Sequence, residues 1–187
     1  MKSPPRDKND HIVNFKLFFH AYAFIGVMEA FFSHVMFFVY MQYYEGIYPS
    51  DILLSFNNWG DGYLGRTADQ LNEAVYQAQS VYFVTLVFMQ LFGNLLTTRT
   101  NRLSFFSMLP WKKDSRNLWI FAAQIVSLGC MFFVSALPII QDVFFTRVPR
   151  VEFYFIGLGF AMIIFFVDEF RKCMVRRKVW IFKKLAW

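Results

Sequence analysis

Three polar side chains inside long apolar stretches have the chemistry to act on an ion. Glu29 interrupts YAFIGVMEAFFSHV, and helical spacing places it on one face with Tyr22 and Ser33. Gln90 and Asn94 interrupt FMQLFGNLLTT. Carboxylate and amide oxygens coordinate hard cations, and they also join neighbouring helices by hydrogen bonds. We call Glu29, Gln90 and Asn94 the ion-path candidates. Ion coordination and helix–helix hydrogen bonding both stay open for them, because either role offsets the cost of a polar group in hydrocarbon.

A second group of charged residues follows the last apolar stretch, in FFVDEFRKCMVRRK. An acidic pair stands one helical turn before several basic residues, where it opposes the helix macrodipole. Basic groups of the same turn, or of a neighbouring loop, must therefore hold the pair. We predict a structural cluster at the cytoplasmic end of this helix, with no catalytic role: Asp168, Glu169, Arg171, Lys172, Arg176 and Arg177.

Composition indicates that lipid surrounds most of the chain. Hydrophobic residues make up 57% of the 187 residues, and charged residues 17%, against about 25% in soluble domains. The formal charge of +6 flanks the apolar stretches instead of alternating with aromatic residues on one surface, so nucleic-acid binding is not expected. With 2 cysteines, no disulfide framework is predicted, and the polar N-terminal stretch does not resemble a secretory signal.

Four stretches have the length and apolar character to cross a bilayer. They cover residues 15–40, 75–96, 118–140 and 152–168. The sequence therefore predicts an all-α, polytopic membrane protein with one membrane domain, residues 1–178, followed by a cytoplasmic tail, residues 179–187.

The basic residues predict the sidedness of these crossings, because Lys and Arg accumulate in cytoplasmic loops. Of 19 Lys and Arg residues, all but Arg66, Arg147 and Arg150 lie in the N-terminal arm, the middle loop or the tail. Both termini should therefore be cytoplasmic, with loop 42–73 outside.

Local patterns predict several details of the helices. Thr67 should cap the second long helix in a capping box with Gln70. Pro138 should end the third helix. Gly93 permits close helix approach, and Gly157 and Ala161 in the fourth stretch form a small-xxx-small pair for helix packing.

Several motifs in order resemble one family of ion pumps. VDEFRKCMVRR is similar to the end of the last transmembrane helix in the catalytic α subunit of sodium/potassium-type P-type ATPases. Five further motifs resemble earlier parts of the same region of that family. The loop before the seventh helix is similar to PPRDKNDHIVN, and the seventh helix to YAFIGVMEA. The eighth helix is similar to SVYFVTLVFMQ, the loop after it to RTNRLS, and the end of the ninth helix to SALP. Each motif is short, and their common order and spacing over residues 1–178 carry the resemblance.

The resemblance implies the C-terminal support unit, helices seven to ten, of a ten-helix cation pump. ATP and Mg would belong to the pump's other domains, because the D-K-T-G-T and T-G-E-S motifs are not found in this sequence. Expected partners are membrane lipid, the remaining transmembrane helices and a β-type accessory subunit at loop 42–73, in the plasma membrane. The chain could be a fragment, a truncated gene product or a stand-alone remnant. The alternative is an independent four-helix scaffold or small pore without ATPase activity.

The sequence also departs from that family at ion-binding positions. Gly93 stands where the family has a cation-coordinating aspartate, and Val126 and Ser127 stand where it has two glutamates. Glu29 replaces a glutamine. The motif of the outer loop that engages the β subunit and the paired tyrosines of the tail also have no counterpart. These departures leave the transported ion and its stoichiometry open.

Overall fold

The computed structural model describes residues 15–53, 59–60, 62–98, 100, 103–112 and 117–180. Within them the backbone forms helices and turns, and four helical segments are long and apolar enough to span a membrane. The predicted all-helical, four-span architecture is therefore confirmed for the part of the chain that the structure describes. The N-terminal arm, Arg99, Arg102, Lys113, Arg116 and the tail residues 181–187 lie outside the described residues.

The first span runs continuously from Phe15 to Tyr44. It contains α1 (Phe15–Phe18), the π-helical segment η1 (Phe19–Gly26) and α2 (Val27–Tyr44). A π-helical segment changes the phase of the helix faces on its two sides.

Because of this change of phase, the face that was expected to hold Tyr22, Glu29 and Ser33 together is split. Tyr22, inside η1, is 66% exposed, whereas Glu29 and Ser33 on α2 are buried. The extrapolation of one polar face from Ser33 back to Tyr22 is wrong, because it assumed an unbroken α-helix.

The second span begins at Ala68, not near residue 75 as expected. It contains α4 (Ala68–Phe88), the π-helical segment η3 (Met89–Asn94) and α5 (Leu95–Thr97). The predicted capping box at its start is confirmed: Gln70 N donates to Thr67 Oγ1 over 3.4 Å, and Thr67 N donates to Gln70 Oε1 over 3.1 Å.

The third span is α6 (Trp119–Ala136), and Pro138 ends it as predicted by starting a separate short helix, α7 (Pro138–Phe144). The fourth span is α8 (Val151–Arg176), which continues through the acidic pair and the first basic residues instead of ending near residue 168. The charged cluster is therefore built on regular helix, which sets the spacing of its side chains.

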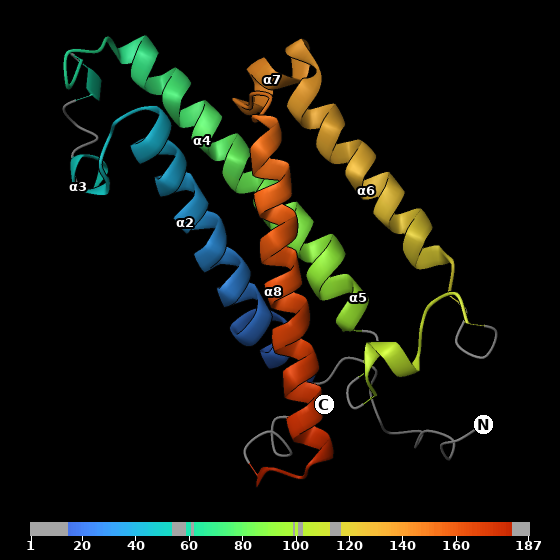
Figure 1. Ribbon diagram of the computed structural model, residues 1–187. Helices are drawn as coiled ribbons and strands as arrows, with labels where there is room; N and C mark the ends of the chain where they lie inside the picture. The colour runs from blue at the N-terminus through green and yellow to red at the C-terminus, as the bar shows by residue number, and fades with distance from the viewer. Residues whose placement is uncertain are drawn as a thin grey trace.

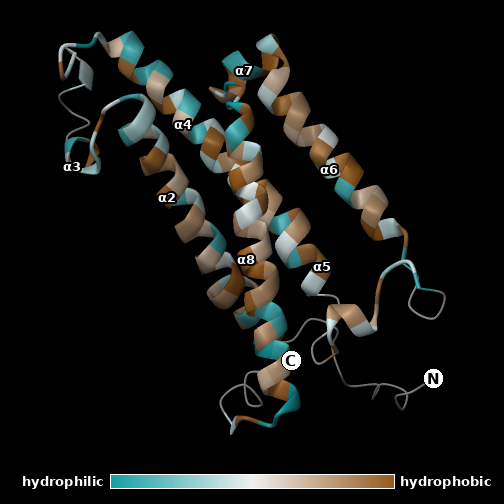
Figure 2. Ribbon diagram, viewed as in Figure 1, coloured by the Kyte–Doolittle hydropathy of each residue, from teal (hydrophilic) through white to brown (hydrophobic). Residues whose placement is uncertain are grey.

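The first, second and fourth spans pack closely, and the third span, α6, stands to one side. α2 lies along α4, and α8 crosses α4 and η3, while α6 joins the others mainly through α4 and α7 (Figure 1). Most of α6 is exposed, including Trp119 at 84%. Figure 2 shows apolar colour along the spans and polar colour at the start of α4 and the end of α8.

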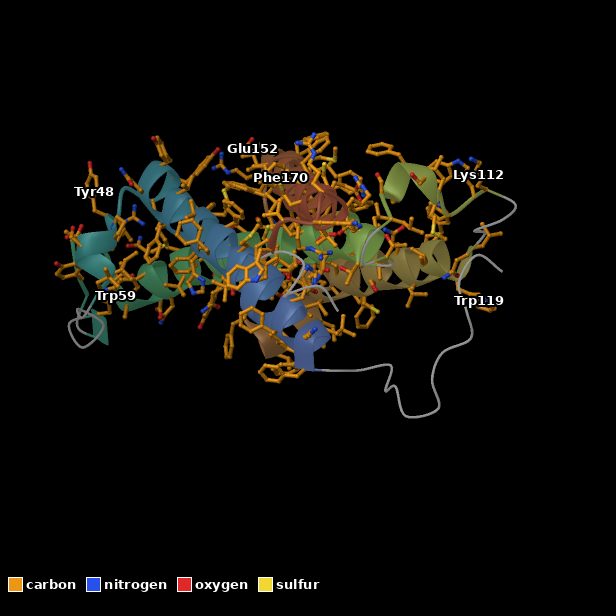
Figure 3. All side chains as sticks on the ribbon, turned by 90° about the horizontal axis from the view of Figure 1, so that it is seen from below. Tyr48, Trp59, Lys112, Trp119, Glu152 and Phe170 are labelled. Atoms are coloured by element: carbon orange, nitrogen blue, oxygen red, sulfur yellow. The ribbon has the colours of Figure 1, made fainter. Side chains whose placement is uncertain are left out.

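The connection between α2 and α4 folds back onto the helices. It contains the short helix α3 (Pro49–Ile52), and Ile47, Ile52 and Trp59 are buried against the core formed by α2, α4 and Phe153. In Figure 3, Tyr48 and Trp59 lie near α3 at one side, whereas Lys112 and Trp119 lie at the opposite side. We call the end with α3 and α7 the loop end.

The other end of the bundle is the terminal end, where the first span begins and the fourth span finishes. His20 of η1 contacts Asp168 of α8 there, so the two ends of the membrane domain lie on the same side. This agrees with an even number of crossings. The cytoplasmic placement of this side remains a prediction from the basic residues.

Candidate functional site

The three ion-path candidates meet at one place between the first two spans. The side-chain amides of Gln90 and Asn94 lie next to the Glu29 carboxyl. Gln90 and Asn94 lie in the π-helical segment η3, and Glu29 lies one turn after η1. Mid-span π-helical turns are frequent at functional sites, and two of them flank this contact.

Glu29 is almost completely enclosed, with 4% of its surface exposed. Its Oε1 atom is buried and has no hydrogen-bond partner among the described residues. The hydroxyl of Thr98 donates to the side-chain oxygen of Asn94, so that amide is held from both sides. The site thus combines a carboxylate with two amides, and one carboxylate oxygen is left unsatisfied.

Gln90 differs from Glu29 because it also reaches an open surface. It lines a groove of about 270 Å³ between the second span and α6. The lining is mostly apolar, and Ser127 of α6 adds a hydroxyl. Gln90 therefore connects the enclosed carboxyl of Glu29 with an exposed groove.

Gly93 lies on a different face, packed against α8. A Cβ atom at this position would stand 2.8 Å from the carbonyl oxygen of Ala161 and 3.0 Å from the Cβ of Ile164. The predicted close approach is present here, since Gly93 and Ala161 are both buried in the crossing of η3 and α8. The structure thus leaves no room for a side chain where the resembling family has a carboxylate.

Two buried polar side chains of α6 form hydrogen bonds inside the bundle. Gln124 is buried, and its Nε2 donates to the carbonyl oxygen of Leu91 in η3 over 2.7 Å. Ser135 is also buried, and its hydroxyl donates to Met131 O over 2.8 Å. Gln124 therefore holds α6 against the second span, whereas the Ser135 bond stays within α6. Val126 on the same helix is 65% exposed.

A network of buried charges forms at the terminal end. Asp168 has no exposed surface, and its Oδ1 accepts from Arg171 Nε over 2.7 Å and pairs with His20 Nε2 at 3.1 Å. Lys172 Nζ, also fully buried, lies 3.1 Å from Asp168 Oδ2. The i, i+3 and i, i+4 spacings on α8 bring the charges of this helix together.

Glu169 extends this network to the loop after the second span. Its Oε2 accepts from the Ser104 hydroxyl over 2.6 Å, and its Oε1 accepts from Phe105 N over 3.0 Å. Lys172 lies between the two carboxylates, 3.0 Å from Glu169 Oε1, and donates to Thr97 O at the end of α5. We call this set the terminal network: His20, Thr97, Ser104, Phe105, Asp168, Glu169, Arg171 and Lys172.

Sequence reasoning found the α8 members of the terminal network and missed the others. Asp168, Glu169, Arg171 and Lys172 are brought together, while Arg176 and Arg177 lie exposed at the end of α8. His20 was not predicted, although a histidine near the start of an apolar span is a signal for such a partner. The hydroxyl and backbone groups of Ser104 and Phe105 carry no comparable signal.

The loop end holds arginines that are half-exposed. Arg147 forms a two-point pair with Glu73, with Nε at 2.6 Å from Oε1 and Nη2 at 2.8 Å from Oε2. The hydrogen bond to Glu73 raises the pKa of Arg147. Arg66 pairs with Glu45 at 2.7 Å, beside a pocket of about 450 Å³ that Glu73 also lines.

Within the described ranges, no group of three or more His, Cys, Asp or Glu residues could hold a metal ion. Cys130 and Cys173 are free thiols.

Comparisons with known proteins agree with the architecture. The human sodium/potassium-transporting ATPase subunit alpha-4 is 28% identical over 188 residues, which cover 95% of this chain and 18% of that protein. Potassium-transporting ATPase alpha chain 1 of Xenopus laevis is 27% identical over 182 residues, which cover 93% of this chain and 17% of that protein. The chain thus spans less than a fifth of the length of these relatives.

The family described as "Cation transporting ATPase, C-terminus" matches residues 1–174. The resemblance inferred from the short motifs is thereby confirmed over nearly all of the sequence. With four apolar spans and this match, the chain is a multi-pass membrane protein, and it belongs to the family of cation-transporting ATPase C-terminal regions.

Proposed function

We propose that this chain is the C-terminal membrane part of a P-type pump for monovalent cations and contributes to transport within the full pump. The carrying observation is Gln90, which faces an exposed groove on one side and the Glu29 carboxyl on the other. An amide oxygen in that place can replace part of an ion's hydration shell. The relatives with sodium/potassium-transporting and potassium-transporting in their names support this ion class.

The second part of the proposed role is mechanical support. The terminal network joins the first and fourth spans with the end of the second, and the Gly93–Ala161 contact holds η3 against α8. A rigid unit of this kind can buttress transport helices that lie beside it. The exposed faces of α6 offer apolar surface for lipid or for those helices.

We propose no catalytic residue in this chain, and we assign ATP hydrolysis to other parts of the pump. Phosphoryl transfer requires positioned phosphates, a metal ion and a group that orients the nucleophile. The described residues offer buried structural ion pairs instead. A purified preparation of the 187-residue chain that turns over ATP would contradict this assignment.

The proposed partners follow from the surfaces of the bundle. Lipid and the remaining pump helices would cover the spans, and a β-type accessory subunit would bind loop 42–73, where Arg66 and Glu45 flank the larger pocket. The plasma membrane is the proposed location. Cross-linking of an accessory subunit to the region of Tyr48, which is exposed, would support the loop assignment. Cross-linking of that subunit to α6 and not to the Tyr48 region would contradict it.

A chimeric pump tests the proposal directly. This chain would replace the matching region of the human sodium/potassium-transporting relative, and cation-stimulated ATP hydrolysis would be measured in membranes. We expect Gln90→Ala to raise the cation concentration for half-maximal stimulation by about 10-fold, the effect of losing about 1.4 kcal/mol of binding free energy.

The matched control is Gln79→Ala, because Gln79 is also exposed on the second span but lies in α4, away from the groove. It should leave the half-maximal concentration unchanged. Equal behaviour of both variants would contradict an ion-facing role for Gln90. If, in addition, the separately expressed chain failed to co-purify with the remaining part of the pump, the independent scaffold or pore would replace the present proposal.

A further inference from the structure

One backbone carbonyl group of η3 accepts a hydrogen bond from another span. In a regular α-helix, the N–H of each residue donates to the carbonyl oxygen four residues earlier. The N–H of Leu95, which follows η3, donates instead to Gln90 O, five residues earlier. The carbonyl oxygen of Leu91, which Leu95 would use in an α-helix, accepts from Gln124 Nε2 of α6 over 2.7 Å. The side chain of Gln124 thus takes the place of a backbone donor.

Other carbonyl groups of η3 also accept from side chains, but these side chains belong to the same span. The Thr97 hydroxyl donates to Gly93 O over 3.1 Å, and the Thr98 hydroxyl donates to Asn94 O over 2.7 Å. Threonine commonly makes such bonds to the preceding turn of its own helix. These bonds are local and need no particular packing of the spans. The bond from Gln124 is different, because its donor is 33 residues away along the chain.

Burial makes the bond from Gln124 costly to lose. Gln124 is 6% exposed, whereas the next residues of α6, Ile125 and Val126, are 71% and 65% exposed. Hydrocarbon offers no water to replace a lost partner, so a broken bond would leave both the amide and the Leu91 carbonyl unsatisfied. Gln124 therefore favours the backbone arrangement in which Leu91 O is open to α6.

The register of η3 determines which faces of the second span meet the neighbouring spans. A π-helical segment turns the residues after it by about 100° relative to those before it, the angle of one residue in an α-helix. Gln90, near the start of η3, lies next to the Glu29 carboxyl of the first span. Gly93, near its end, lies against Ala161 of α8. The π-helical register makes both contacts at once.

The contact with α8 and the bond to α6 constrain η3 in different ways. Gly93 packs tightly, but it has no side chain, and apolar packing is not directional. A hydrogen bond to a carbonyl oxygen prefers a defined angle, so the Gln124 bond constrains the rotation of the Leu91 peptide about the helix axis. The residue that receives this bond lies between Gln90 and Gly93 in the sequence.

The same bond joins the two walls of the exposed groove. Gln90 and Leu91 line the groove on the side of the second span, and Ser127 and Met131 line it on the side of α6. Gln124 precedes Ser127 by about one helical turn. Its bond to Leu91 therefore holds the wall that carries Gln90 against the opposite wall.

We propose that Gln124 is a positioning residue, which holds η3 in its π-helical register through Leu91 O and thereby keeps Gln90 between Glu29 and the groove. Gln124 acts through Gln90 and needs no contact with the transported ion. The register rests on the hydrogen bonds of η3, whereas the effect on transport rests on the proposed function.

Solid-state NMR of the full 187-residue chain in lipid bilayers tests the register, since carbonyl ¹³C shifts respond to hydrogen bonding and helix geometry. Gln124→Met keeps the length of the side chain and removes its N–H groups, whereas Gln124→His keeps a ring N–H donor. We expect Gln124→Met to move the Gln90 and Leu91 carbonyl shifts toward those of α4, because Leu95 N–H then donates to Leu91 O. Gln124→His should keep the wild-type shifts.

The matched control is Thr146→Val, which removes another bond to α6 and nearly keeps the shape of the side chain. The hydroxyl of Thr146, which is 9% exposed, donates to Val134 O over 2.9 Å. This bond lies outside η3, so its loss should loosen the end of α6 and leave the carbonyl shifts of η3 unchanged.

The chimeric pump tests the effect on transport. Gln124→Met should raise the cation concentration for half-maximal stimulation by about 5-fold and leave the maximal rate within about 2-fold. A merely structural role would lower the amount of folded pump, and hence the maximal rate, without changing the half-maximal concentration. Gln124→His should restore the wild-type value, and Thr146→Val should not change it.

Unchanged carbonyl shifts in Gln124→Met would overturn the inference, because η3 would then keep its register without this bond. The inference would also be wrong if the shifts changed while the half-maximal concentration stayed the same in a pump where Gln90→Ala raises it. If Gln90→Ala itself has no effect, the proposed function fails at Gln90, and the NMR result still decides the register.

Discussion

The two ends of the bundle use the same kinds of ion pair in opposite surroundings. At the terminal end, Asp168 and Lys172 are fully buried, and each has several partners. At the loop end, the side chains of Arg147 and Glu73 are 25% and 47% exposed, although their pair is shorter and has two contact points. Pair geometry is therefore better at the end where water can compete.

This difference indicates that burial, more than the distance between the charged atoms, determines how strongly each ion pair affects stability. Exposed pairs contribute about 0–1 kcal/mol, because water and salt screen them. Buried pairs add little net stability relative to apolar packing, but removal of one partner leaves an uncompensated charge. The terminal network should thus determine which helices meet, and the loop-end pairs should only adjust a contact that apolar packing already makes.

The largest expected effect comes from removing the central carboxylate of the terminal network. Asp168→Ala leaves Arg171 and Lys172 buried without it, and should lower the free energy of unfolding by about 3–5 kcal/mol. Reversible unfolding in detergent micelles would measure the change. Asp142→Ala, at an exposed aspartate of α7, should stay within about 0.5 kcal/mol. A loss below 1 kcal/mol for Asp168→Ala would remove the contrast between the two ends.

The close crossing above the terminal network gives the next effect. Gly93→Ala places a methyl group 2.8 Å from Ala161 O, and should cost about 1–3 kcal/mol through overpacking. The control is Gly129→Ala on α6, where a Cβ meets nothing within 4 Å, and where alanine should gain up to about 1 kcal/mol of helix propensity. Equal stability of the two variants, measured by the same unfolding titration, would show that α8 does not need this close contact.

A single hydroxyl tests whether the network reaches the loop after the second span. Ser104→Ala removes the donor to Glu169 Oε2 and should cost about 1.5 kcal/mol, near the low end for a bond to a charged group because both residues are half-buried. Hydrogen exchange at the Phe105 amide, which also donates to Glu169, should become faster. Ser107→Ala, at an exposed serine nearby, should change neither quantity.

Much of the fold could be predicted because a membrane span has a length and composition that are visible in the sequence. The α8 part of the terminal network was visible for the same kind of reason, since helical spacing alone brings Asp168 to Arg171 and Lys172. His20 could not be paired with Asp168 in advance, because 148 residues separate them and no periodic pattern links two different spans.

At the candidate ion site, too, single residues could be predicted from the sequence, whereas their contacts across helices could not. A polar residue in hydrocarbon is conspicuous, so Glu29, Gln90 and Asn94 were found singly, yet their meeting depends on how the first two spans pack. The π-helical segments were not predicted either, and η1 is the reason that Tyr22 and Glu29 lie on different faces.

The smallest expected effect lies at the loop end and completes the comparison. Glu73→Gln removes the charge opposite Arg147 and should cost about 0–1 kcal/mol, with the cost decreasing as salt is added. Arg147 keeps its backbone N–H bond to the Ser80 hydroxyl and its Nη1 bond to Thr146 O, so the chain between α7 and α8 stays in place. Because the hydrogen bond to Glu73 raises the pKa of Arg147, its contribution is present at neutral pH and, on the alkaline side, is lost only at strongly alkaline pH. The difference between wild type and Glu73→Gln should therefore be constant from neutral to mildly alkaline pH in unfolding titrations. A loss above 2 kcal/mol, or one that salt does not reduce, would mean that the loop end depends on its charges as strongly as the terminal end does.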